Sequence, residues 1–155
     1  MEKLIARAEK THSLSEEEII ILLENEAAEE PLAQAADRVR SAFVGDGIHL
    51  RGLIEFSNIC RQNCMYCGLR RDNRRIERYR LSAEDILRLA QKARGYGYQT
   101  VVLQSGEDPY FSAERLAALL REIKRLGLVI TLSIGERSFA EYKLLREEEK
   151  AKKKS

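Results

Sequence analysis

Apolar residues recur at helical spacing through the first forty-odd residues. Ser15 and Glu18 form a capping box, in which the serine side chain accepts from the Glu18 backbone amide and the glutamate reaches back. Two apolar series at helical spacing follow. They are Ile19, Ile20, Leu22 and Leu23, and then Ala33, Ala36, Val39 and Phe43. We therefore expect residues 1–45 to form a helical lead-in rather than a second domain.

Beyond the turn residues 45–47, short apolar runs alternate with helical stripes. Short runs rich in β-branched residues are typical of buried parallel strands, and a serine before an apolar stripe is a good helix N-cap. The expected order is strand 49–56, helix from Ser82, strand 100–105, helix from Ser112, strand 128–134 and a last helix from near Ser138.

This order predicts an α/β fold with about three parallel β/α units. Such units build either an open doubly wound sheet or a barrel, and in both folds ligands gather at the carboxyl ends of the strands. The turns expected at those ends are the cysteine-containing loop and residues 104–107 and 133–136. A complete TIM barrel needs about 250 residues, so we expect residues 46–146 to form an incomplete core.

Charge and hydropathy narrow the classes of function. The net charge of +2 argues against nucleic acid or acidic membranes as partners. No apolar run reaches the roughly 18 residues of a membrane span, and the N-terminus lacks the features of a signal peptide, so a cytoplasmic location is expected. Residues 70–80 hold six arginines, but Asp72 and Glu77 lie among them. We interpret this stretch as a solvated or salt-bridged loop. Contacts with a cofactor and binding of nucleic acid are the less favoured alternatives. Residues 147–155 are expected to be a charged, disordered tail.

The three cysteines of the chain, Cys60, Cys64 and Cys67, have the spacing CxxxCxxC directly after a predicted strand. Thiolates suit iron–sulfur clusters, and a 4Fe–4S cluster held by three of them keeps one iron open. An open iron can chelate the amine and carboxylate of S-adenosylmethionine (SAM), and one electron then cleaves the sulfonium to a 5′-deoxyadenosyl radical. A zinc site or unligated thiols are the alternatives. Zinc would need a fourth ligand, and neither His12 nor His49 has ligand spacing.

A second candidate feature follows the next strand. Ser105-Gly106-Glu107 combines a glycine, which lets the backbone approach a ligand closely, with a carboxylate that can pair with the SAM ammonium. The alternative is a simple turn with a solvated glutamate. Its place one β/α unit after the cysteine loop favours an amine-binding site.

Three stretches carry a family resemblance: EFSNICRQNCMYCGLRRDNRRIERYRLS, TVVLQSGEDPYF and ITLSIGE. They resemble the HydE family of radical-SAM maturases, relatives of biotin synthase that help assemble the diiron site of FeFe hydrogenase. The cysteines carry the broader radical-SAM likeness, and GLRRDN with LQSGEDPY carries the narrower one. The resemblance covers roughly residues 1–142, and it implies the N-terminal part of a radical-SAM, partial TIM barrel.

The resemblance also implies site residues and cofactors. A 4Fe–4S cluster would be bound by Cys60, Cys64 and Cys67. SAM would be bordered by Tyr66 against the adenine, by Gln104, Ser105, Gly106 and Glu107, with Glu107 on the amino group, and by Thr131 and Ser133 in the SAM and substrate cavity. The implied substrate is a small molecule or an iron complex, and other hydrogenase maturases are the implied partners.

The sequence departs from this family in length. Family members continue for a further half or more, which closes the barrel and supplies an arginine to SAM, whereas here the similarity fades after Tyr142. Whether this chain is itself an enzyme is left open by the sequence. The alternatives are another biotin-synthase-like radical-SAM enzyme, such as a methylornithine synthase, and a catalytically inactive cluster- or metal-binding product.

Overall fold

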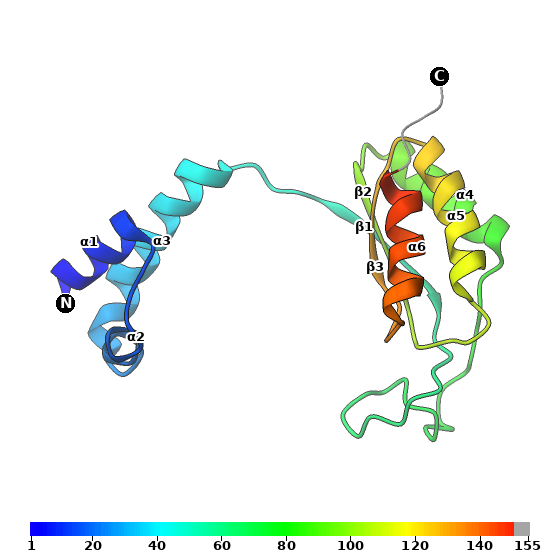
Figure 1. Cartoon of the computed structure of the whole chain (residues 1–155), viewed down its shortest axis with the longest axis horizontal. Coiled ribbons are helices and arrows are strands. Elements are labelled where there is room, and N and C mark those ends of the chain that lie inside the picture. The colour runs from blue at the N-terminus through cyan, green and yellow to red at the C-terminus, as the bar shows by residue number, and fades with distance from the viewer. Residues whose placement is uncertain (151–155) are drawn as a thin grey trace. The chain divides into compact units, whose positions relative to one another are not determined.

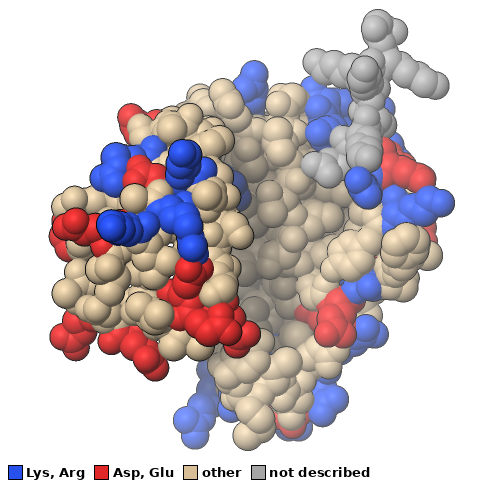
Figure 2. All heavy atoms as spheres, turned by 60° about the vertical axis from the view of Figure 1, so that its left-hand side comes forward, with Lys and Arg blue, Asp and Glu red and all other residues tan. Residues whose placement is uncertain are grey.

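The chain is divided into two compact units, Met1–His49 and a second unit that begins at Leu50 (Figure 1). A computed structural model describes residues 1–150. Within that range no helix is long and apolar enough to cross a membrane. Acidic and basic side chains are intermixed on the face seen in Figure 2.

The first unit is helical, as expected. The predicted capping box is confirmed: the Ser15 hydroxyl accepts from the Glu18 amide at 3.3 Å, and the Glu18 carboxylate accepts from the Ser15 amide at 2.8 Å. The box fixes the start of the second helix. The elements are α1 (Glu2–Thr11), α2 (Glu16–Leu23), the 3₁₀ turn η1 (Glu26–Ala28) and α3 (Glu29–Val44).

The buried face of this unit differs from the apolar series read in the sequence. Its small hydrophobic cluster consists of Ile5, Leu22, Ala28 and Ala35, with Leu32 packed against it. Of the expected series, Ile19, Ile20, Leu23 and Phe43 are exposed. The short helix α2 buries only Leu22, and α3 turns the face containing Leu32 and Ala35 inward. The unit therefore has a small core of its own.

The second unit contains the predicted α/β pattern. Its three strands are parallel, in the order β1-β2-β3, and no further strand occurs within residues 1–150, so the sheet does not close into a barrel there. Strand β1 starts two residues later than expected, because its register with β2 starts at Arg51 opposite Thr100. The elements are β1 (Arg51–Ser57), α4 (Ala83–Gly95), β2 (Thr100–Ser105), α5 (Ala113–Arg125), β3 (Val129–Ser133) and α6 (Phe139–Lys150).

The two faces of this sheet differ in character. Ile54, Phe56 and Leu103 point into the main hydrophobic core, which they share with apolar residues of α4 and α5. Right-handed connections between neighbouring parallel strands place all helices on the same face, and Figure 1 shows α4, α5 and α6 there. The opposite face carries alternate, mainly polar positions, including Glu55 and Gln104.

Helix α6 extends past the expected boundary at residue 147. It is helical to Lys150, Leu145 is buried in the core, and Glu148 pairs with Arg121 of α5 at 2.5 Å. This ion pair holds the final turn of the helix against α5, although the sequence there is only a charge run. The rest of the predicted disordered tail, residues 151–155, lies outside the described residues.

Candidate functional site

The cysteine loop, residues 58–80, connects β1 to α4 and is fixed by one arginine. Arg78 is half-buried, and its guanidinium donates to four backbone carbonyls on both arms of the loop. These carbonyls belong to Asn58 at 2.5 Å, Leu69 at 3.0 Å, Arg70 at 2.7 Å and Asn73 at 3.1 Å. A guanidinium has five donors in a rigid plane, so Arg78 ties the two arms together. Within the stretch expected to be a solvated or salt-bridged loop, this arginine therefore has a structural role.

All three cysteines are free thiols on this loop. Cys64 is exposed, Cys60 and Cys67 are partly exposed, and the Cys67 amide donates to the Cys64 carbonyl at 3.1 Å. Within the described part of the chain, no three histidine, cysteine, aspartate or glutamate side chains converge on one metal position, the three cysteines included. Accessible thiols spaced along one loop fit a cluster, in which each cysteine binds a different iron.

Gly106, at the end of β2, lies directly against the cysteine loop. A Cβ atom at this position would be 2.3 Å from the Ile59 carbonyl oxygen and 2.9 Å from Cys60 Cβ. The Gly106 amide donates to the Ser57 carbonyl at 2.9 Å, and the Glu107 amide donates to Cys60 Sγ at 3.4 Å. The close backbone approach predicted for this glycine is thus made to the loop itself, and it connects the first cysteine to the end of the second strand.

Gly106→Ala is expected to push the loop away from β2. The added methyl group meets backbone atoms that cannot rotate aside, and overpacking of this kind costs about 1–3 kcal/mol. Chemical denaturation of the variant would measure this loss of free energy of unfolding. Gly68→Ala is the matched control, because a Cβ at Gly68 of the same loop meets no atom within 4 Å. Equal stability of the two variants would contradict the tight contact.

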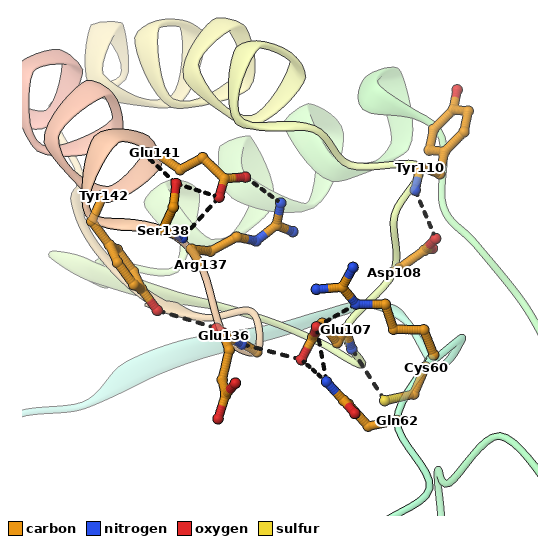
Figure 3. A network of polar contacts seen from close by, with 12 residues as sticks. Cys60, Gln62, Glu107, Asp108, Tyr110, Glu136, Arg137, Ser138, Glu141 and Tyr142 are labelled. Atoms are coloured by element: carbon orange, nitrogen blue, oxygen red, sulfur yellow. Dashed lines mark hydrogen bonds and ion pairs between the residues drawn. The ribbon is translucent and has the colours of Figure 1, made fainter.

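Glu107 is buried, with 7% of its side chain exposed, which excludes the alternative of a solvated turn glutamate. Its Oε1 accepts from Arg61 Nε at 2.5 Å and from Gln62 Nε2 at 3.1 Å (Figure 3). Its Oε2 accepts from Gln62 Nε2 at 3.1 Å and from the Glu136 amide at 3.3 Å. Burial raises the pKa of this carboxyl, but these hydrogen bonds and the Arg61 charge outweigh it, so the net pKa is lowered. Glu107 is therefore an anion at neutral pH.

Asp108, which the sequence reading missed, anchors the same corner. It is fully buried, and its carboxylate accepts two hydrogen bonds from Arg80 at 2.7 and 2.8 Å and one from Ser57 Oγ at 2.6 Å. The guanidinium of Arg80 also lies 4.3 Å from the centre of the Tyr110 ring. This cluster joins the end of β1, the end of the cysteine loop and the turn after β2. The Arg80–Asp108 ion pair agrees with the salt-bridged form of the interpretation given to residues 70–80.

The remaining predicted residues lie on the open face of the sheet or at the tip of the loop. Gln104 pairs in register with Ser133 on one side and with Glu55 on the other, and Thr131 lies two residues before Ser133. Glu55 was missed, although the alternation of β1 places it in this row. Ser105 ends β2 and is half-buried. Tyr66 is 93% exposed at the loop tip, so it does not pack against the other predicted residues.

A cavity of about 520 Å³ lies beside Glu107, between the turns that follow β2 and β3. Arg137 lines it with only 8% of its side chain exposed, and Arg137 Nε has no hydrogen-bond partner in the part of the chain whose side chains are described. Its Nη1 is 3.4 Å from Glu141 (Figure 3). The other residues lining the cavity are Arg61, Glu107, Asp108, Pro109, Ser112, Glu136, Ser138 and Glu141.

Sequence reasoning missed Arg61, Gln62 and Arg137. The sequence did contain a signal for the Arg61–Glu107 ion pair. Arg61 is a cation next to the first cysteine, and Glu107 is an anion just after the next strand, so the two charges were expected at the same edge of the sheet.

A parallel β/α sheet with a three-cysteine loop after its first strand defines a class of cluster-binding protein. The chain belongs to the radical SAM superfamily, whose family model matches residues 54–153. Members of this superfamily generally bind a 4Fe–4S cluster and SAM.

Two curated relatives illustrate the narrower similarity. The chain is 50% identical over 107 residues to the FeFe hydrogenase maturase subunit HydE of Thermotoga maritima, covering 69% of this chain and 31% of that protein. It is 36% identical over 119 residues to the 3-methylornithine synthase of Methanosarcina acetivorans, covering 75% of this chain and 34% of that protein. The chain thus spans about a third of the length of these relatives.

Solved structures show the same fold. The methylornithine synthase PylB matches with a TM-score of 0.82 and 31% identity, over 94% of this chain and 44% of that one. The FeFe-hydrogenase maturase HydG from Carboxydothermus hydrogenoformans matches with a TM-score of 0.81 and 28% identity, over 94% of this chain and 35% of that one. The three parallel strands correspond to the N-terminal part of the radical-SAM barrel, as the sequence predicted.

Proposed function

We propose that this chain carries the cluster- and SAM-binding part of a HydE-type radical-SAM enzyme that acts in FeFe-hydrogenase assembly. The observation that carries the proposal is the contact between Gly106 and the cysteine loop, which places Glu107 beside Cys60. When bound, the 4Fe–4S cluster supplies the electron that cleaves SAM to a 5′-deoxyadenosyl radical. The cluster would be held by Cys60, Cys64 and Cys67.

The chain's own residues have separate tasks in this proposal. The Glu107 amide donates to Cys60 Sγ at 3.4 Å, which holds the first cysteine against the end of β2. The Glu107 carboxylate, ionised and buried, binds the SAM ammonium. Arg78 holds the two arms of the loop at a fixed separation. The residues proposed to border SAM and the substrate are Tyr66, Gln104, Ser105, Gly106, Thr131 and Ser133.

The hydrogenase role is the narrower part of the proposal. It is supported by the 50% identity to HydE, compared with 36% to the 3-methylornithine synthase. The substrate would be a small molecule or an iron complex, other hydrogenase maturases would be partners, and the location would be the cytoplasm. The free, accessible cysteines are consistent with a reducing compartment.

Electron paramagnetic resonance of the chain, reconstituted with iron and sulfide and reduced with dithionite, tests the cofactor site. We expect a reduced 4Fe–4S signal that shifts when SAM is added, because three cysteines leave one iron open to the amine and carboxylate. Formation of 5′-deoxyadenosine would then separate an enzyme from a module that only binds. A cluster signal indifferent to SAM, or no cluster, would refute the proposed SAM site.

A further inference from the structure

The Glu107 carboxylate is already paired with three donor groups in the structure. A carboxylate offers about four acceptor positions, and here four contacts occupy the two oxygens: Arg61 Nε, Gln62 Nε2 twice and the Glu136 amide. The SAM ammonium assigned to this carboxylate is a strong donor of its own. Because only 7% of the Glu107 side chain is exposed, an ammonium that reaches the carboxylate competes with the present donors for the same space.

Arg61 is the donor that an ammonium displaces most readily. The Glu136 donor is a backbone amide fixed by the turn after β3, and Gln62 is neutral, so neither repels an incoming cation. Arg61 is a cation, its side chain is 61% exposed, and its guanidinium regains water when it swings out. Exchange of one cation for another keeps the buried carboxylate paired, and only the exposed Arg61 guanidinium moves into water.

We propose that Arg61 is a placeholder cation, which occupies the ammonium position on Glu107 and is exchanged for the SAM ammonium. The inference rests on the proposed function and goes beyond it, because it makes a residue inside the CxxxCxxC motif a competitor of SAM. The exchange leaves the loop attached, since the Arg61 amide still donates to the Glu107 carbonyl at 3.0 Å. It also keeps the buried carboxylate paired throughout, which avoids the cost of an isolated buried charge.

The test is equilibrium binding of SAM to the full chain carrying an oxidised cluster, which supports binding without turnover. Arg61→Ala is expected to bind SAM about fivefold more tightly than the wild type, because the ammonium then displaces no competing cation. Arg61→Lys keeps a competing cation and is expected to bind as the wild type does. Arg75→Ala removes the same charge from an exposed position of the same loop, and unchanged affinity there would show that the gain is specific to Glu107.

A second measurement follows Arg61 itself. Phenylglyoxal modification, read by peptide mass spectrometry, is expected to label Arg61 several-fold faster once SAM is bound, because the guanidinium then leaves Glu107. SAM binding by Arg61→Ala that is unchanged or weaker than wild type, in a variant that unfolds at the same denaturant concentration, overturns the inference alone. A wild-type chain that holds a cluster but binds no SAM overturns the proposed function and the inference with it.

Discussion

Replacing Cys64 by alanine is expected to lower the iron retained after anaerobic reconstitution from about four atoms per chain to nearly none. The chain contains three cysteines, and no group of three histidine, cysteine or acidic side chains in the described part of the chain converges on a metal position. No reserve ligand can therefore replace the thiolate that is removed, and the two thiolates that remain cannot hold three irons of a cubane. Iron and acid-labile sulfide analysis, with the visible absorption of the cluster, would measure the loss.

Met65→Ala is the matched control for this variant. Met65 is the neighbouring residue and is similarly exposed, but its thioether is not a thiolate ligand. Its substitution is expected to leave about four irons per chain. Wild-type iron content in Cys64→Ala would mean that this cysteine does not bind the cluster, and equal loss in both variants would mean that the loop conformation, rather than the thiol, is decisive.

Asp108→Asn is expected to destabilise the second unit by about 1.5–3 kcal/mol, the cost of weakening hydrogen bonds to a charged group, because the Arg80 side chain left behind is 34% exposed. The substitution keeps the shape of the side chain but leaves the Arg80 guanidinium, now at 2.7 and 2.8 Å, without its counter-charge. Small domains have about 5–15 kcal/mol of stability in total, so the effect is large. Chemical denaturation measures it. Asp85→Asn removes an exposed ion pair with Arg88 and is expected to change little.

The same variant has a pH signature. Burial raises the pKa of Asp108, but hydrogen bonds from Arg80, Ser57 and the Tyr110 amide outweigh burial, so the pKa lies below its ordinary value of 3.8. A carboxyl whose pKa is lowered in the folded state contributes stability above pH 3.8 and loses it as the pH falls through the folded-state pKa. Wild-type stability should therefore fall in that acid range, while Asp108→Asn should lack this part of the decrease. If the stability of the wild type and of Asp108→Asn fell in parallel as the pH is lowered, the role given to the Arg80–Asp108 ion pair would be contradicted.

Local signals in the sequence were sufficient for most of the second unit. Ser82 and Ser112 are N-caps as predicted, and β2 has the predicted bounds, because caps and short β-branched runs act within a few residues. The side-chain partners of Asp108 are Ser57 and Arg80, which lie 51 and 28 residues away in the chain. No local pattern specifies such a pair, since it depends on which strand ends meet.

The first unit shows the same limit in its helices. Periodicity identified α2 and α3 as helical, yet Phe43 of the expected stripe is exposed and Ala35, outside it, is buried. Both helices carry more than one apolar face, and the sequence alone does not say which face another helix covers. In the row formed by Glu55, Gln104 and Ser133, the last two residues were predicted and Glu55 was missed. Its place in the row depends on the pairing of β1 with β2, which the sequence alone does not give.

The division into two units, each with its own hydrophobic cluster, affects how the stability of this chain is measured. Units with separate cores need not unfold cooperatively, and a single transition midpoint is then not a defined quantity. All six tyrosines lie at or after Tyr66, and the chain has no tryptophan. Tyrosine fluorescence therefore reports unfolding of the second unit alone, whereas far-ultraviolet circular dichroism sums the helices of both. The difference between the two signals isolates the first unit without any truncation of the protein.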